Sequence, residues 1–429
     1  MMIENFESLA ENTSREFFEI RKDLLEILDY VLEEMNSYNL LKKITRKEGE
    51  KIYIGEEKID IRKYKRIFLT GFGKASGSMA KAIEEIIDFD EECIITTEDI
   101  NLKKAIVFKG THPWPSEINL KATEKIIDIF ERANEDDLII VLISGGGSSL
   151  LCKPKISLEG MIEITEELMK KGCTIEELNV VRKHLSHVKG GKLAKMTKAS
   201  ILSLIISDII GNPVELIASG PTSPDSSSAK EAMKIIEKYG IKNKEAIEAL
   251  KKDEKISKLE NVKNIIVADN EMACKKALEK AVEKGYYGKI FTNRLKGEAR
   301  AVGKDLGKFA KIYPRNRAIL IFGGETTVKV KGNGTGGRNQ EIVLSAIEEI
   351  KDEEIAFISF GTDGIDGNSP AGGAIADGNS YGKAMEKKLI IEEFLEENNS
   401  YEFFRILGDV IITGYTGTNV MDIQLIGKI

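Results

Sequence analysis

The sequence has few cysteines, no long apolar run and no excess of basic residues, and each absence excludes a class of protein. Its four cysteines are isolated, without a C-x-x-C pair, which favours reduced thiols over a disulfide framework or a zinc site. No segment approaches the roughly 18 apolar residues of a membrane span, and the acidic N-terminus lacks the apolar core of a secretory signal. The net charge of -7 is distributed without a cationic stripe. We therefore expect a cytoplasmic protein without membrane or nucleic-acid partners.

Alternating strand and helix patterns fill most of the 429 residues, a length that suggests two or three domains. Continuous apolar runs such as 66–71, 138–146 and 201–208 are typical of strands buried on both faces of a parallel sheet, and helical patterns separate them. The sequence therefore predicts α/β domains, the first a doubly wound, Rossmann-like sheet and the second a smaller α/β domain.

We expect an N-terminal domain over residues 1–255 and a C-terminal domain over residues 256–429, whose final strand could return to the first domain. Apolar residues at helical spacing over 12–35 predict an amphipathic helix that packs on the first domain. The stretch KIYIGEEKIDI, residues 51–61, predicts a hairpin with Gly55 in its turn.

Nearly every strong strand ends in a glycine-rich loop, which is where ligands bind in open α/β sheets. The helices that follow offer unpaired N–H groups to anions. The first loop, GFGKASG at 71–77, is spaced G-x-G-x-x-x-G and fits neither the dinucleotide fingerprint nor the P-loop. It puts Lys74 at a predicted helix start, where a cation is unfavourable unless an anion is bound. The alternative is a glycine turn with an incidental surface lysine.

The second loop, SGGGSSLL, follows the most apolar strand and combines three glycines with three hydroxyls. Successive glycine N–H groups can form an anion-binding nest. A purely structural triple glycine would cost conformational entropy without a gain in packing. We therefore expect this loop to hold an anionic group with Ser144, Gly145, Gly146, Gly147, Ser148 and Ser149.

A basic cluster in NVVRKHLSHVKGGK offers Arg182 and Lys189 for recognition of a carboxylate or phosphate. A basic, solvent-facing helix explains the same residues equally well, so both interpretations stay open. His184 and His187 are three positions apart, but no further Cys or His supports a zinc site.

Two aspartates follow strands in glycine-rich turns, Asp208 in SDIIGNP and Asp363 in GTDGIDG. Such aspartates are often only turn formers. Two of them among phosphate-binding loops favour Mg²⁺, which takes one or two carboxylates plus phosphate oxygens. In GTGGRNQE, Arg338 opens a helix, again an unfavourable placement unless an anion is near. Its guanidinium could neutralise charge on a transferred phosphoryl group.

With eight ordered blocks, the sequence resembles the class II glycerate kinases, whose carboxyl-terminal half is called the MOFRL domain. The blocks cover nearly the whole chain from about residue 10 and read GFGKAS, THPWPS, LISGGGSSLL, ELNVVRKHLSHVKGGKLA, LIISDIIGNP with IASGPTSPD, GGETTVKVKGNGTGGRNQE, GTDGIDG and GYTGTNVMD. The resemblance implies two α/β domains with the active site in the cleft between them, and ATP with Mg²⁺ as cosubstrate.

The resemblance also assigns roles to single residues. The family's two proposed catalytic cations correspond to Lys74 and Arg338, and Asp208 and Asp363 are the expected metal ligands. Besides the 144–149 loop, the residues expected to bind substrate or phosphate are Gly73, Ser76, Arg182, Lys189, Glu325 and Asn339.

Three blocks depart from the family pattern. THPxPD ends here in Ser116, SDVxGDD reads SDIIGNP, and the Pro-Thr-Asp that commonly follows GTDGIDG is replaced by Asn-Ser-Pro at 368–370. Metal binding would then rely on Asp208 and Asp363, with Glu325 as a further candidate.

The resulting hypothesis is direct, Mg²⁺-assisted phosphoryl transfer from ATP to D-glycerate, with 2-phosphoglycerate as the product that the resemblance favours. Three alternatives stay open. They are a 3-kinase that gives 3-phosphoglycerate, an NAD(P)H-dependent hydroxypyruvate reductase and a non-catalytic sugar-acid sensor. The glycine spacing at 71–77 disfavours the reductase. The expected partners are small-molecule substrates, and a homodimer is left open.

Overall fold

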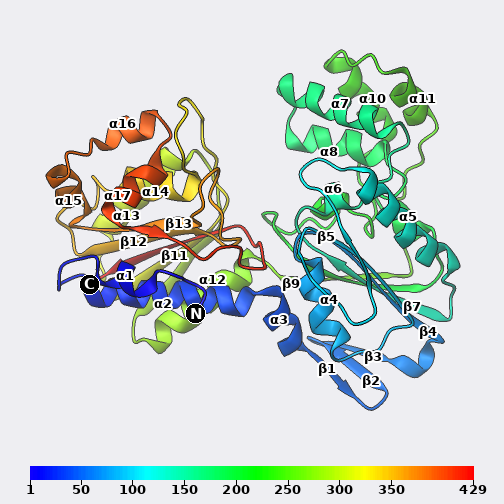
Figure 1. Cartoon of the computed structure of the whole chain (residues 1–429), viewed down its shortest axis with the longest axis horizontal. Helices are drawn as coiled ribbons and strands as arrows, with labels where there is room; N and C mark the ends of the chain where they lie inside the picture. Colours follow the sequence, from blue (N-terminus) through cyan, green and yellow to red (C-terminus); the bar gives the residue numbers. More distant parts are fainter. The chain divides into compact units, whose positions relative to one another are not determined.

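The computed structural model covers residues 1–429 and forms two compact units, each with its own sheet and hydrophobic core (Figure 1). One unit is Ser37–Val267, and the other joins Met1–Asn36 to Ala268–Ile429. Helices pack on a sheet in both units, so the expected class of two α/β domains is confirmed. These units differ from the expected domains, residues 1–255 and 256–429. Residues 1–36 belong with the C-terminal part of the chain, and the other unit extends to Val267.

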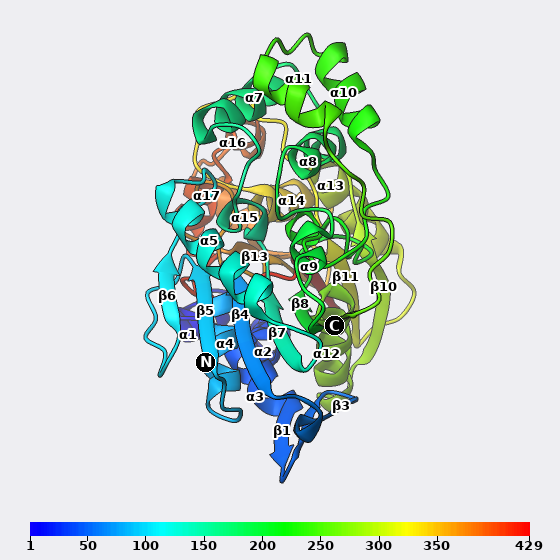
Figure 2. The ribbon, with the colours of Figure 1, turned by 90° about the vertical axis from the view of Figure 1, so that its right-hand side faces the viewer.

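The Ser37–Val267 unit is built on six strands: β4 (Arg66–Phe72), β5 (Glu91–Thr96), β6 (Ile106–Lys109), β7 (Asp137–Ile143), β8 (Ser200–Ile206) and β9 (Val262–Ala268). Their order in the sheet is β6-β5-β4-β7-β8-β9, and Figure 2 shows the strands from β6 to β8 side by side. The pairs from β6 to β8 are parallel. Strand β7 is buried along its whole length, which is why its sequence is a continuous apolar run.

The chain changes direction in this sheet at β4 and β7. From β4 it moves outward to β5 and β6, and it then returns to pair β7 with the other side of β4. Helix α4 (Ser76–Glu84) makes the first crossover, and α5 (Glu117–Arg132) leads back to β7. In doubly wound sheets ligands bind beyond the carboxyl ends of the strands at such a switch point. The loops GFGKAS and SGGGSS follow β4 and β7, the two strands that form it.

Smaller elements complete this unit. They are α3 (Ser37–Ile44), β1 (Thr45–Glu48), β2 (Lys51–Ile54), β3 (Glu57–Asp60), α6 (Gly147–Leu150), α7 (Leu158–Lys170), α8 (Ile175–His184), α9 (Lys192–Lys195), α10 (Ala229–Lys238) and α11 (Lys244–Lys251). The expected hairpin is confirmed as β2–β3, with Gly55 at φ 58° in the turn. Helices α7, α8, α10 and α11 share an apolar cluster beyond one end of the main sheet (Figures 1 and 2).

The second unit contains a mixed six-stranded sheet. Its strands are β10 (Tyr287–Leu295), β11 (Ala318–Gly324), β12 (Ile355–Gly361), β13 (Gly373–Asp377), β14 (Val410–Ile411) and β15 (Asp422–Lys428), in the order β10-β11-β15-β12-β13-β14. Strand β15 runs antiparallel to both β11 and β12. The first residue of β15 therefore lies beside the last residues of its two neighbours.

Helices cover both faces of this sheet. They are α1 (Phe6–Glu11), α2 (Phe18–Met35), α12 (Asn270–Glu283), α13 (Ala299–Ile312), α14 (Arg338–Ala346), α15 (Ser380–Glu386), α16 (Ile391–Glu396) and α17 (Ser400–Leu407). Helices α13, α14 and α17 contribute to the main core on one face, and α2 and α12 lie side by side on the other (Figure 1).

The N-terminal helix does not pack on the first domain, so that prediction was wrong. Helix α2 contacts α12 and β15 of the second unit. Within its buried face Arg21 forms ion pairs with Asp377, at 2.8 Å, and with Asp409. Apolar spacing identified the buried face of the helix but not its partner, because any apolar surface satisfies that pattern. The buried guanidinium restricts the choice, since it requires these two carboxylates.

Two strands also differ from expectation. Strand β9 was assigned to the start of the second domain but is the sixth strand of the first sheet. The final strand, β15, stays in the sheet of its own unit and does not return to the first. The four cysteines are unpaired, as expected. None of the helices combines the length and apolar character that crossing a bilayer requires.

Candidate functional site

The loops after β4 and β7 interlock at the switch point. The Lys74 N–H donates to the Gly145 carbonyl at 2.8 Å, and the Ala75 N–H donates to Ser144 Oγ at 3.0 Å. Gly73 has φ 138°, and a methyl group on it would lie 2.1 Å from Ser144 Oγ. Glycine is therefore required at 73 both for its backbone conformation and for the approach of the second loop.

The side chains of Lys74 and His112 meet over the second loop. A methyl group on Gly146 would lie 3.1 Å from both Lys74 Cγ and His112 Cδ2. Partial desolvation and the charge of Lys74 together lower the pKa of His112, which keeps the imidazole neutral near pH 7. His112 was not predicted as a site residue. The available signal was its position in THPWPS, directly after a strand of the same sheet.

Asp208 reaches the same loop from β8. A methyl group on Gly145 would lie 2.4 Å from Asp208 Oδ2, so the carboxylate occupies the space that this glycine leaves. The N–H groups of Gly145 and Gly146 donate to no backbone or side-chain acceptor in the structure. The structure thus brings together an ammonium group, two N–H donors and one carboxylate. This is the arrangement that a phosphate with a divalent cation requires.

Gly145→Ala should separate the Asp208 carboxylate from the loop without unfolding the protein. The three atoms nearest to the new methyl group all belong to Asp208, and the φ of residue 145 is not positive. We expect the Mg²⁺ concentration for half-maximal activity to rise about 10- to 100-fold, the usual effect of disturbing a residue that orients a metal ligand. Activity measured against Mg²⁺ checks this. An unchanged Mg²⁺ dependence would remove Asp208 from the metal assignment.

Arg182 and Lys189 lie close together and have different environments. Burial lowers the pKa of the Arg182 guanidinium, and no hydrogen bond or ion pair to protein compensates for that burial. Burial first, and then the charges of Arg182 and Lys192, lower the pKa of Lys189 to about 8. The Lys189 ammonium donates to the carbonyls of Ser148, at 2.7 Å, and Leu151, at 3.0 Å. We infer that Lys189 holds the second loop in shape, whereas Arg182 is available to an anion.

Lys183 and His184 of the predicted basic cluster are buried and paired, so the interpretation as a solvent-facing helix fails for these two residues. Lys183 pairs with Asp225, and His184 shares a hydrogen bond with Asp253, which also pairs with Lys155. Burial alone would raise the pKa of both carboxyls, but the hydrogen bonds that they accept hold both values below the usual range. This network ties α8, the helix of Arg182, to the loops around residues 225 and 253.

Asp253→Asn should lower the free energy of unfolding by about 3–5 kcal/mol, because it leaves the buried His184 and the partly buried Lys155 without their carboxylate. A depressed folded-state pKa gives stability that is complete above the ordinary value of 3.8 and is lost as the pH falls below it. The variant should therefore lose less stability than the wild type between pH 5 and pH 3. Urea denaturation across this range measures both effects. Asp99→Asn, at an exposed acid of the same unit, should change stability by less than about 0.5 kcal/mol.

The hydroxyls of the two loops are largely used within the protein. Ser76 Oγ donates to the Gly73 carbonyl at 2.8 Å and to the Ile95 carbonyl at 2.9 Å. Ser148 Oγ shares a hydrogen bond with Ser219 Oγ at 2.9 Å, and Ser149 Oγ donates to the Pro113 carbonyl at 2.7 Å. These side chains fix the loops, so we expect the backbone N–H groups to be the donors to a ligand.

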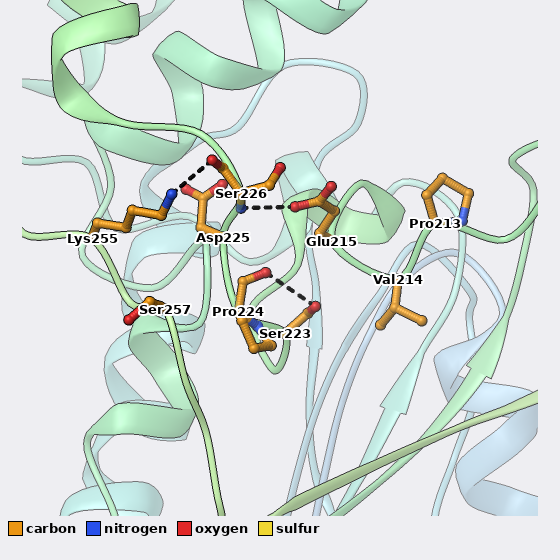
Figure 3. A pocket seen from close by; sticks show the side chains of 9 residues that line it. All are labelled: Pro213, Val214, Glu215, Ser223, Pro224, Asp225, Ser226, Lys255 and Ser257. Atoms are coloured by element: carbon orange, nitrogen blue, oxygen red, sulfur yellow. Dashed lines mark hydrogen bonds between the residues drawn. The ribbon is translucent and has the colours of Figure 1, made fainter.

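A separate hollow of about 530 Å³ lies in the same unit (Figure 3), and none of the predicted site residues lines it. Its polar groups are bonded to one another. The Lys255 ammonium donates to the Ser226 carbonyl at 2.8 Å, and the Ser226 N–H donates to Glu215 Oε2 at 2.9 Å. Because these bonds link Lys255 and Glu215 to the backbone of Ser226, the switch point remains the candidate site. Its lining comprises Pro213, Val214, Glu215, Ser223, Pro224, Asp225, Ser226, Lys255 and Ser257.

The second unit fixes Arg338 between two carboxylates. Asp422, the fully buried first residue of β15, lies opposite Gly324 of β11 and Gly361 of β12. Arg338 Nε and Nη2 donate to Asp422 at 2.6 and 2.8 Å, and Nη1 lies 3.1 Å from Glu325 Oε1. Burial alone would lower the pKa of Arg338, but Asp422 and then Glu325 raise it. Asp422 was missed by the sequence analysis, although GYTGTNVMD ends on it.

The start of α14 is held by a buried aspartate. Asp366 accepts the N–H groups of Asn339 and Gln340 at 3.0 and 2.9 Å, and burial raises its pKa to about 7. The fully buried Asn339 amide is bonded to Asp366 and Ser359. Asn339, which was predicted to bind substrate, is thus better placed to orient the helix. Asp363 lies in its turn, accepting the Ile365 N–H at 3.2 Å.

The structure divides the predicted site residues between the units. Lys74, the 144–149 loop, Arg182, Lys189 and Asp208 belong to one, and Glu325, Arg338, Asn339 and Asp363 belong to the other. No three His, Cys, Asp or Glu side chains cluster as a self-sufficient metal site. The Asp208 carboxylate beside the Gly145 loop is an oxygen ligand of the kind that Mg²⁺ takes, one or two of them together with phosphate oxygens and water.

Comparison with known proteins gives two family matches and several close relatives. Residues 23–251 match a domain of unknown function, DUF4147, and residues 318–422 match the MOFRL family. A glycerate 2-kinase from Pyrococcus horikoshii is 38% identical, with 95% of this chain and 97% of the relative covered. A D-glycerate 2-kinase from Thermotoga maritima is 39% identical, with 85% and 91% covered. The crystal structure of a glycerate kinase from T. maritima has a TM-score of 0.87 at 34% identity and covers 96% of this chain and 100% of its own.

Proposed function

The chain belongs to the class II glycerate kinase family, and from this premise we propose that it transfers a phosphoryl group from ATP to the 2-hydroxyl of D-glycerate. The glycerate kinase activity follows from the relatives, which match over most of the chain. The donor, the metal and the position of the phosphate are our proposals.

One observation carries the proposal. Lys74, the free N–H groups of Gly145 and Gly146, and the Asp208 carboxylate meet at the switch point of the sheet. Phosphoryl transfer depends mainly on positioning and charge neutralisation, and this group of residues supplies both. The glycine spacing of the first loop does not suit a nicotinamide dinucleotide.

In the proposed reaction the glycerate hydroxyl oxygen forms a bond to the γ-phosphorus, and the bond from that phosphorus to the bridging oxygen of ADP breaks. The hydroxyl proton passes to solvent, and ADP leaves with the bond's electron pair. Lys74 and Arg338 neutralise the charge of the transferring group, the 145–146 N–H groups orient a phosphate or carboxylate, and Arg182 binds the remaining anion. Mg²⁺, when held by Asp208, would neutralise phosphate oxygens. Asp363 and Glu325 are the candidate metal ligands of the other unit.

The test is an assay with ATP, Mg²⁺ and D-glycerate, coupled through enolase and pyruvate kinase. An immediate signal means 2-phosphoglycerate, which is the expected result. A signal that needs added phosphoglycerate mutase would mean the 3-isomer instead. No signal with either, together with oxidation of NADH or NADPH by hydroxypyruvate, would replace the kinase with a reductase. Ligand binding without any turnover would indicate a sensor.

A further inference from the structure

The only tryptophan of the chain lies exposed in the loop that leads from β6 to α5. Trp114 keeps 38% of its surface accessible. Single exposed apolar side chains are common on protein surfaces, so exposure alone carries no function. The significance of Trp114 depends on how its loop is fixed and on what lies next to it.

Four hydrogen bonds fix the loop, and two of them connect it to Ser149 of the anion-binding turn. Thr111 Oγ1 donates to the Trp114 carbonyl at 2.7 Å, and Ser149 Oγ donates to the Pro113 carbonyl at 2.7 Å. The buried Asn119 amide donates to the carbonyls of Thr111 and Ser149, both at 3.0 Å. Trp114 is therefore presented on a firmly held backbone that is bonded to the loop of Gly145 and Gly146.

The position of His112 shows how close Trp114 lies to the site. It lies against Gly146 beside Lys74. Trp114 follows two residues later, so the two Cα atoms are at most about 7 Å apart. The backbone of an exposed aromatic residue therefore lies near Lys74 and the free N–H donors of Gly145 and Gly146. A nucleotide needs cationic or N–H groups to bind its phosphates and a flat aromatic face on which its base can stack.

We propose that the indole of Trp114 stacks on the purine base of the phosphoryl donor. This inference rests on the proposed function, because it assigns the nucleotide to the Ser37–Val267 unit. Stacking uses the π-face and is tolerant of base identity, so the ring recognises a purine without distinguishing adenine from guanine.

Tryptophan fluorescence tests the proposal directly, because Trp114 is the only tryptophan of the chain. Titration with ADP and with GDP should quench the emission saturably. Tripolyphosphate and D-glycerate, which have no aromatic ring, should leave it nearly unchanged. Equal quenching by tripolyphosphate or by D-glycerate would mean that the ring responds indirectly, and the inference would fail.

Variants of Trp114 distinguish stacking on the base from a purely structural role of the side chain. Trp114→Phe should keep nucleotide affinity within a few-fold, whereas Trp114→Leu should raise the Kd for ADP about 5- to 100-fold, the loss expected for one stacked base. The KM for D-glycerate and the melting temperature should not change. Ile175→Ala removes another exposed apolar side chain of the same unit and should leave the Kd unaltered. Tight ADP binding by Trp114→Leu, measured by calorimetry, would overturn the proposal.

The outcome is separable from that of the proposed function. An enzyme that converts ATP and D-glycerate but shows no response to ADP would refute the stacking alone. A protein whose fluorescence ADP quenches, but which forms no phosphoglycerate, would retain the nucleotide site and lose the kinase assignment.

Discussion

Lys74→Met should lower kcat by about 10³-fold, the usual effect of removing one group that stabilises charge in a transition state. Methionine keeps most of the length of the side chain and removes only its charge. The ammonium of Lys74 has no protein acceptor, so its loss leaves no buried partner unpaired. The free energy of unfolding should therefore stay within about 0.5 kcal/mol of the wild-type value. Steady-state kinetics with the coupled assay and urea denaturation measure the two quantities.

The matched control is Lys121→Met, at an exposed lysine on α5 of the same unit. It removes the same charge from the domain and should leave kcat unchanged. If Lys121→Met and Lys74→Met lost activity equally, general electrostatics would explain the effect. If neither lost activity, Lys74 would have no part in the reaction.

The parts of the fold that depend on local pattern were predictable from the sequence. The unbroken apolar run of residues 138–146 predicted a strand buried on both faces, and β7 is buried along its whole length. The partner of an amphipathic surface was not predictable. Helix α2 has an apolar face that suits either unit, and only the folded chain shows Arg21 between Asp377 and Asp409.

In the candidate site, too, local features were predictable from the sequence and long-range partners were not. Glycine-rich turns after strands indicated where an anion would bind, because backbone N–H groups and strand ends follow from local sequence. Which side chains remain available depends on distant acceptors. Ser76 and Lys189 carry the right donors but use them on backbone carbonyls, Ser76 on that of Gly73 and Lys189 on that of Ser148. Asp422 was missed for the same reason, since it acts through an arginine that is far away in sequence.

Arg338→Met should reduce kcat by about 10³-fold or more, the range observed for arginines that neutralise a transferring phosphoryl group. It should also lower the free energy of unfolding by about 3–5 kcal/mol, because the fully buried Asp422 loses its ion-pair partner. Activity must therefore be measured where circular dichroism shows the variant to be folded. Arg338→Lys keeps the charge but loses the bidentate contact, so its activity should lie between that of the wild type and that of Arg338→Met.

The double variant Arg338→Met with Asp422→Asn distinguishes a role in the reaction from a role in stability. Replacing the carboxylate by a neutral amide removes the unpaired buried charge, so most of the lost stability should return. Activity should not return with it, because no guanidinium remains to meet the phosphoryl group. Recovery of kcat in the double variant would show that Arg338 serves only to neutralise Asp422. The single variant Asp422→Asn completes the cycle. It keeps the guanidinium but frees it from the carboxylate that orients it, so kcat should fall more than the KM values change.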